Sequence, residues 1–67
     1  MTVDVNGERR TLRPGLTVSD LLADLGLHVP SGIAVAVNAR VVTRAAFGTH
    51  ALRDGDEIEI IRAVAGG

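Results

Sequence analysis

The 67 residues of this chain are enough for one small domain. A domain of this length buries only about 60% of its unfolded surface, which leaves little room for a deep substrate pocket and favours a carrier or binding module over a free-standing enzyme. Seven basic and eight acidic residues give a net charge of −1, and the scattered arginines with a single aromatic residue, Phe47, do not form a nucleic-acid-binding surface.

The N-terminal residues predict a β-hairpin. Residues 2–5 alternate polar and apolar side chains, Asn6-Gly7 is a strong hairpin-turn signal, and Glu8 to Leu12 can return antiparallel. The two valines of the first strand and Leu12 are expected to face a core. Arg10 falls on the same inward parity, so it is expected near the edge of the sheet. Pro14-Gly15 then ends the strand.

A capped amphipathic helix is predicted next. Thr17 can accept a hydrogen bond at the helix N-terminus, and Asp20, three residues later, is a short version of the capping-box partner. An apolar stripe at positions i, i+3, i+4 and i+7 is formed by Val18, Leu21, Leu22 and Leu25. Gly26 is expected to end the helix in a left-handed conformation. One helix beside a small sheet must use this stripe as core.

The remaining chain predicts a loop from Leu27 to Gly32 and then three strands. Ile33 to Val37 is apolar on both parities and is expected in the middle of the sheet, followed by a short strand at Arg40–Val42. A single helical turn is expected around Phe47, which we predict to fill the core. The Asp-Gly pair within residues 53–56 predicts a turn into a last strand over Glu57–Ile61.

The last strand and the residues after it are the predicted functional region. Ile58 and Ile60 are expected to point inward, so Ile61, Glu57 and Glu59 share the opposite face, where they are predicted to contact a partner. The sequence then ends in Ala63, Val64, Ala65, Gly66 and Gly67. Glycine is a poor residue with which to finish a packed strand, but it can enter a channel too narrow for side chains, and five extended residues reach about 17 Å. An ordinary frayed end is the alternative interpretation.

Cysteine and lysine are both absent, and all seven basic residues are arginine. Without cysteine there is no disulfide framework and no thiolate nucleophile, as is usual in a reducing cytosol. Because the sequence also lacks an export signal or an apolar stretch long enough to span a membrane, we expect a cytoplasmic protein that contacts no membrane. His28 and His50 lack any spacing typical of a metal site, so no metal is predicted and both are interpreted as solvated loop residues.

This order of elements predicts an α+β fold in which a mixed β-sheet packs against one main α-helix, the layout of a β-grasp, or ubiquitin-like, domain. In that layout the first and last strands run side by side at the centre of the sheet. We therefore divide the chain into a β-grasp domain over residues 1–62 and a flexible Gly-Gly tail over residues 63–67.

Several short motifs, in this order and spacing over the whole chain, resemble the ThiS family, the sulfur carriers of thiamin thiazole biosynthesis. They are Asn6, Thr17-Val18, Leu21-Leu22, Ala36-Val37-Asn38, Val41-Val42, the stretch from Leu52 to Asp56, and the closing run from Arg62 to Gly67. The small subunit of molybdopterin synthase, which shares the fold and the Gly-Gly ending, is the second candidate. Its relatives tend to be longer and richer in aromatic residues and proline near the end.

The resemblance implies a carrier that is a cosubstrate and not itself an enzyme. An E1-like adenylyltransferase would use ATP to convert the carboxylate of Gly67 to an acyl-adenylate, and a cysteine-derived sulfur donor would then leave a thiocarboxylate there. Thiazole synthase would receive the sulfur. Gly66, Ala65, Val64 and Ala63 would lie in the channels of these partners, and no cofactor would be bound by the carrier itself.

Two other classes of function remain open at this point. In a non-covalent β-grasp interaction module the Gly-Gly ending would be incidental, and no adenylation that depends on Gly67 would occur. In a protein modifier of the ubiquitin type the tail would form amide-linked conjugates in cells, whereas a sulfur carrier forms none.

Overall fold

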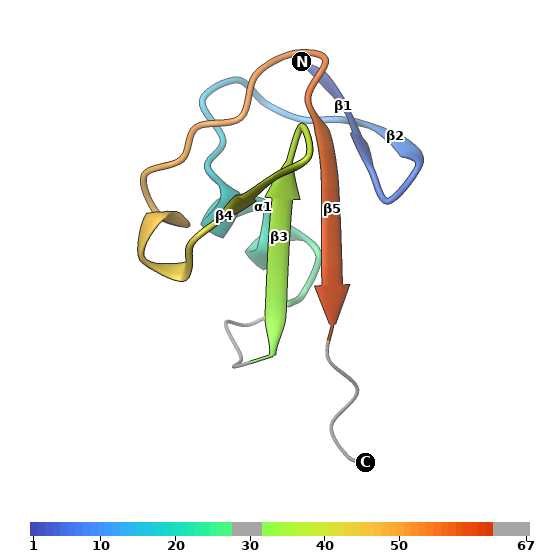
Figure 1. The fold of residues 1–67 in the computed structure, drawn as a ribbon. Coiled ribbons are helices and arrows are strands. Elements are labelled where there is room, and N and C mark those ends of the chain that lie inside the picture. The colour runs from blue at the N-terminus through green and yellow to red at the C-terminus, as the bar shows by residue number, and fades with distance from the viewer. Residues whose placement is uncertain (28–31, 63–67) are drawn as a thin grey trace.

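The computed structural model describes residues 1–27 and 32–62, which form one sheet and one main helix (Figure 1). The elements in chain order are β1 (Thr2–Val5), β2 (Glu8–Thr11), α1 (Val18–Asp24), β3 (Ile33–Val37), β4 (Arg40–Val42), the 3-10 helix η1 (Arg44–Ala46) and β5 (Glu57–Arg62). The predicted helix and strands are therefore confirmed, with β2 ending one residue earlier than expected and β5 one residue later. Most of the predicted loop from Leu27 to Gly32 lies outside the described residues.

The five strands form a mixed sheet in the order β2-β1-β5-β3-β4. The first and last strands run parallel, as predicted, with Asp4 opposite Glu57 and Val5 opposite Ile58, and the other pairs are antiparallel. The expectation that Ile33–Val37 forms the middle of the sheet is wrong, because β5 takes that place and β3 lies beside it. Apolar side chains on both faces of β3 indicated a strand in the interior of the sheet, and β3 is such a strand. They do not indicate which interior strand is the central one.

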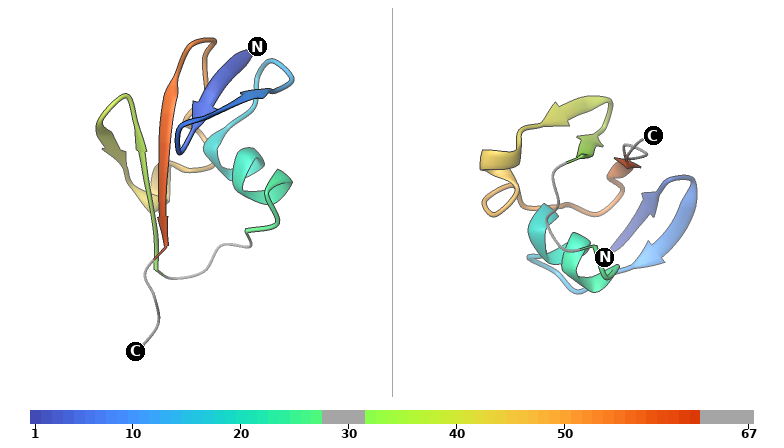
Figure 2. Two further views of the ribbon diagram at one scale, coloured as in Figure 1. Left: turned by 90° about the vertical axis from the view of Figure 1, so that its right-hand side faces the viewer. Right: turned by 90° about the horizontal axis from the view of Figure 1, so that it is seen from below.

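Helix α1 lies against one face of this sheet, which we call the inner face (Figure 2). The predicted capping box is present: the Asp20 amide donates to Thr17 Oγ1 at 3.2 Å, and the Thr17 amide donates to Asp20 Oδ2 at 3.1 Å. Gly26, at φ 75°, follows the helix in the left-handed conformation predicted for it.

The core lies between α1 and the inner face. Its buried apolar residues come from every strand except β2, from the helix and from the loops, and they are Val3, Val5, Leu16, Val18, Leu21, Leu22, Val35, Val37, Val42, Phe47, Leu52, Ile58 and Ile60. The predicted core role of Phe47 is confirmed, since it follows η1 directly and is buried. Among the described residues, no helix is long and apolar enough to span a membrane.

The capping box makes stability depend on pH. Hydrogen bonds from the backbone and side chain of Thr17, with the nearby positive charge of Arg13, hold the pKa of Asp20 below its ordinary value of 3.8. Because the folded-state pKa is the lower one, the ionised Asp20 stabilises the fold above that ordinary value, and the contribution is lost as pH falls through the folded-state pKa. We expect Asp20→Asn to be less stable than wild type in urea unfolding at neutral pH, and the difference to shrink as the pH falls below 3.8.

Candidate functional site

The C-terminal end of β5 is the described part of the predicted functional region. Ala63, Val64, Ala65, Gly66 and Gly67 lie outside the described residues, and the structure establishes only what precedes them. Arg62, the last described residue, ends β5 at the opposite end of the sheet from the N-terminus (Figure 1). The described part of the chain therefore ends on the central strand of the sheet.

Backbone pairing holds β5 along both of its edges. On one side Asp4 and Val5 of β1 are in register with its first residues. On the other side the pairing with β3 continues to the end of the strand, where Ile33 lies opposite Arg62. Strand β1 stops at Val5, however, so the last residues of β5 lack a β1 residue opposite them.

The side chain of Asn6 takes the place of the missing β1 residue. Asn6 has a φ of 51° and turns the chain into β2, yet its carboxamide pairs with both backbone groups of one β5 residue. The Ile60 amide donates to Asn6 Oδ1 at 2.8 Å, and Asn6 Nδ2 donates to the Ile60 carbonyl at 3.3 Å. Two hydrogen bonds thus extend the edge of β5 beyond the end of β1.

A second asparagine binds the start of β5 from the other edge. The Glu57 amide donates to Asn38 Oδ1 at 3.0 Å, and Asn38 Nδ2 donates to Asp56 Oδ1 at 2.9 Å. Asp56 is buried and its other carboxylate oxygen accepts from the Arg53 amide at 2.8 Å. The sequence analysis placed Asn6 in a turn and both asparagines in the family motifs, but it predicted no contact of either with the last strand. A side chain that bonds to a residue 54 or 19 positions away leaves no local pattern.

The three partner-binding residues predicted from β5 lie together on the face of the sheet opposite α1, which we call the outer face. Glu57, Glu59 and Ile61 are exposed, Ile61 to 58%. The register places Val41 of β4 and Glu59 on either side of Ala36, and Val41 is 77% exposed. Val41 was not among the predicted partner-binding residues, because its place beside them follows only from the antiparallel register of β3 with its two neighbours.

Asp4 adds a third carboxylate to the outer face. It lies opposite Glu57 in the parallel pair, and both line a hollow of about 490 Å³ with Glu59. Arg9 lies 3.9 Å from Asp4 and partly offsets the charge. The outer face therefore combines two exposed aliphatic side chains with three acidic ones, which suits a partner with a basic and partly apolar surface.

The predicted interpretation of the two histidines as solvated loop residues can be compared with the structure only at His50, because His28 lies outside the described residues. His50 lies in the loop after η1, as predicted, but it is half-buried. Its burial follows from the backbone bonds on either side of it: its amide donates to Ala46, and its carbonyl accepts from Val18 at the start of the helix. Within residues 1–27 and 32–62 no group of three potential metal ligands occurs.

Comparison with known proteins finds the ThiS family and part of larger thiazole synthases. The model of the ThiS family matches residues 3–67. The sulfur carrier protein ThiS of Escherichia coli is 33% identical over 67 residues, which cover 100% of both chains. A thiazole synthase of Magnetococcus marinus is 36% identical over 100% of this chain, but the chain spans only 20% of that protein's length, and a thiazole synthase of Paramagnetospirillum magneticum is covered to the same extent.

The solved structures agree with the sequence relatives. The crystal structure of a thiamine biosynthesis protein, ThiS, from Geobacter metallireducens superimposes with a TM-score of 0.84 at 32% identity, over 100% of both chains. Its solution structure, determined by NMR, gives a TM-score of 0.82. The mixed five-stranded sheet with one helix is thus the β-grasp fold of these proteins, as predicted.

Proposed function

Because this chain belongs to the ThiS family of sulfur carriers in thiamine biosynthesis, we propose that it carries sulfur as a thiocarboxylate on Gly67. An adenylating enzyme uses ATP to join the Gly67 carboxylate to AMP, releasing pyrophosphate. Sulfide-level sulfur from a cysteine-derived donor then attacks the acyl carbon of Gly67 and displaces AMP, which leaves the thiocarboxylate. The carrier finally delivers this sulfur to thiazole synthase and returns to the carboxylate form.

Elementary chemistry requires the activation step. A carboxylate is a poor electrophile, because oxide would have to leave, whereas the acyl-adenylate loses AMP readily. The thiocarboxylate that results is a soft nucleophile and is ionised at neutral pH, so it can deliver sulfur without releasing free sulfide. All the catalytic groups belong to the partner enzymes, and the carrier supplies a reacting group at the end of a narrow segment.

The observation that carries this proposal is the extent of the family match, which runs through residue 67 and so includes the Gly-Gly pair. The fold supports it as well. The strand that leads into residues 63–67 is central in the sheet and is bonded along both edges, so a partner that recognises the body also receives the tail from a defined position. The thiazole synthase relatives, which contain a similar stretch, support that enzyme as the sulfur acceptor.

Intact-mass analysis of the protein purified from its native host tests the proposal. Under growth with ample sulfur and no thiamin, we expect a fraction heavier by the difference between one sulfur and one oxygen atom, with the change confined to Gly67 in fragment spectra. Removing Gly67 should abolish the heavier species. If native protein never carries the extra mass under these conditions, the carrier function proposed here is wrong.

The outer face is proposed as the docking surface for the adenylating enzyme. Reversing two of its charges, in the double variant Glu57→Lys with Glu59→Lys, should slow adenylation by about tenfold or more, because like charges then face a basic partner. Pyrophosphate exchange with the cognate enzyme measures this rate. Both side chains are exposed, so thermal unfolding should change little. An unchanged exchange rate would remove this face from the docking site.

A further inference from the structure

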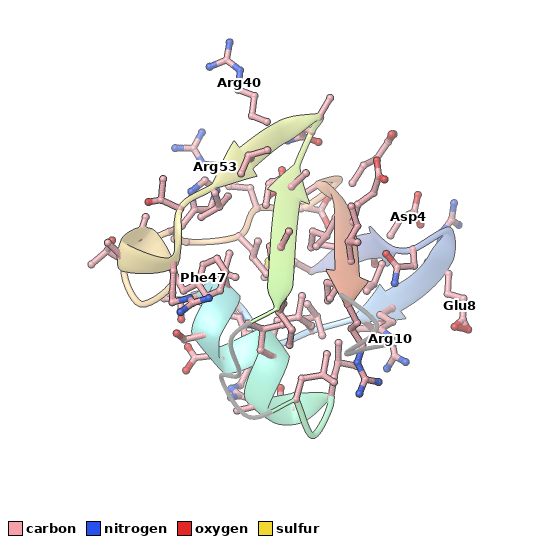
Figure 3. All side chains as sticks on the ribbon, turned by 60° about the horizontal axis from the view of Figure 1, so that its bottom comes forward. Asp4, Glu8, Arg10, Arg40, Phe47 and Arg53 are labelled. Carbon is pink, nitrogen blue, oxygen red and sulfur yellow. The ribbon has the colours of Figure 1, made fainter. Side chains whose placement is uncertain are left out.

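A second surface borders the C-terminal end of β5, on the inner face of the sheet. It is a pocket of about 230 Å³ between the end of α1, the β-hairpin and β5. Its apolar lining is Val5, Leu25, Leu27 and Ile60. Two arginines complete it, Arg10 from β2 and Arg62 from β5, and Figure 3 shows Arg10 beside the end of β5.

The charged residues reach this pocket because the sheet extends beyond the helix. Arg10 is in register with Val3, and Glu8 is in register with Val5. Because both valines face the core, the side chains of Arg10 and Glu8 lie on the inner face of the sheet as well. Helix α1 has only seven residues and does not cover β2, all of whose residues are exposed. Arg62 follows Ile60 by two residues and lies on the same face. The inner face therefore changes from apolar to cationic where β5 ends.

The two arginines have no acidic partner among the residues that the structure describes. Other arginines do have such partners: Arg9 Nε lies 3.9 Å from Asp4 Oδ1, and Arg13 Nη1 lies 3.2 Å from Asp24 Oδ2. No described carboxylate comes within 4.0 Å of Arg10 or Arg62. Glu8 also lines the pocket, so two guanidinium groups and one carboxylate leave an excess of one positive charge. An apolar floor with a cationic rim fits an apolar side chain followed by a carboxylate, which arginine binds in a bidentate manner.

We propose that this pocket docks an acidic segment of thiazole synthase, with an apolar side chain of that segment in the pocket and a neighbouring carboxylate on Arg10 and Arg62. The inference rests on the proposed function, which requires the carrier to visit two enzymes in turn. The outer face, with Asp4, Glu57 and Glu59, repels an acidic segment, and the pocket attracts one. Two faces of the same strand end thus recognise partners of opposite charge.

Affinity for thiazole synthase of the same organism tests the pocket. We expect Arg10→Glu and Arg62→Glu each to raise the Kd by about tenfold or more. Arg10→Lys should raise it less than Arg10→Glu does, because lysine keeps the positive charge but cannot bind a carboxylate in a bidentate manner. Glu8→Gln removes the pocket's one described acidic residue and should tighten binding. Arg40→Glu is the matched control, because Arg40 belongs to β4, at the opposite edge of the sheet from β2, and does not line the pocket (Figure 3). This variant should bind as wild type does. Thermal unfolding confirms that each variant is folded.

The outcomes separate this inference from the proposed function. If wild-type protein acquires the thiocarboxylate but Arg10→Glu binds thiazole synthase as well as Arg40→Glu does, the docking site is wrong and the carrier function stands. If Arg10→Glu slows adenylation as much as it weakens binding to thiazole synthase, the assignment of the pocket to that enzyme is overturned. If wild-type protein is never adenylated, the proposed function fails, and the docking proposal fails with it.

Discussion

Gly66→Val is expected to reduce adenylation by about 100-fold or more while leaving the free energy of unfolding nearly unchanged. The branched side chain enters the segment that the partner's channel must accommodate, and a small displacement of the reacting carboxylate is costly. The core of the described residues is built from side chains between Val3 and Ile60, and the substitution truncates none of them. Pyrophosphate exchange and urea unfolding of the same preparation measure the two effects.

Gly48→Val is the matched control for this variant. Gly48 is exposed, and a Cβ added there meets no atom within 4 Å, so the same change of side chain is accommodated on the body. We expect adenylation and stability close to wild type. Adenylation of Gly66→Val at the wild-type rate would show that no narrow channel receives residue 66, and the proposed route to a thiocarboxylate would have to be abandoned.

Leu21→Ala is expected to have the reverse effect. Leu21 is fully buried in the apolar stripe of α1, and truncating a buried leucine to alanine costs about 2–5 kcal/mol. A small domain has a total stability of only about 5–15 kcal/mol, so the unfolding midpoint should fall markedly. Adenylation should decrease only with the folded fraction, because the tail and both proposed docking surfaces are unchanged.

Val41→Ala provides the comparison for stability. It also removes methyl groups from an aliphatic side chain, but Val41 is 77% exposed, so the expected change in unfolding free energy is within about 0.5 kcal/mol. A loss of stability at Val41 as large as that at Leu21 would contradict the burial that the fold assigns to these residues.

Local signals were sufficient to predict most of the fold. Three features depend only on residues close together in the sequence, and each is confirmed: the Asn6-Gly7 turn, the Thr17 capping box and the left-handed Gly26. The middle of the sheet was assigned wrongly, since strand order depends on pairing between distant segments. Leu16 was also missed as a core residue: it follows a Pro-Gly break and belongs to no periodic pattern, yet it is buried.

Only the residues of the candidate site that lie on a single strand could be predicted from the sequence. Alternation along β5 placed Glu57, Glu59 and Ile61 on one face, and the structure confirms that they lie together. Asp4 and Val41 join that face through pairing with β5 and β3, which no local pattern encodes. The inward parity of Arg10 was visible in the sequence, but its neighbours Leu27 and Arg62 in the pocket come from segments brought together only by folding.

The central position of β5 also has a mechanical consequence. A partner that pulls on residue 63 applies force along the axis of β5, whose hydrogen bonds to β1 and β3 lie across that axis. Those hydrogen bonds and the two from Asn6 therefore bear the force together, in shear. At an edge strand that is pulled away from its sheet, by contrast, the hydrogen bonds would break one after another. The proposed insertion into enzymes and withdrawal from them would therefore load this end of the chain strongly without unravelling the domain.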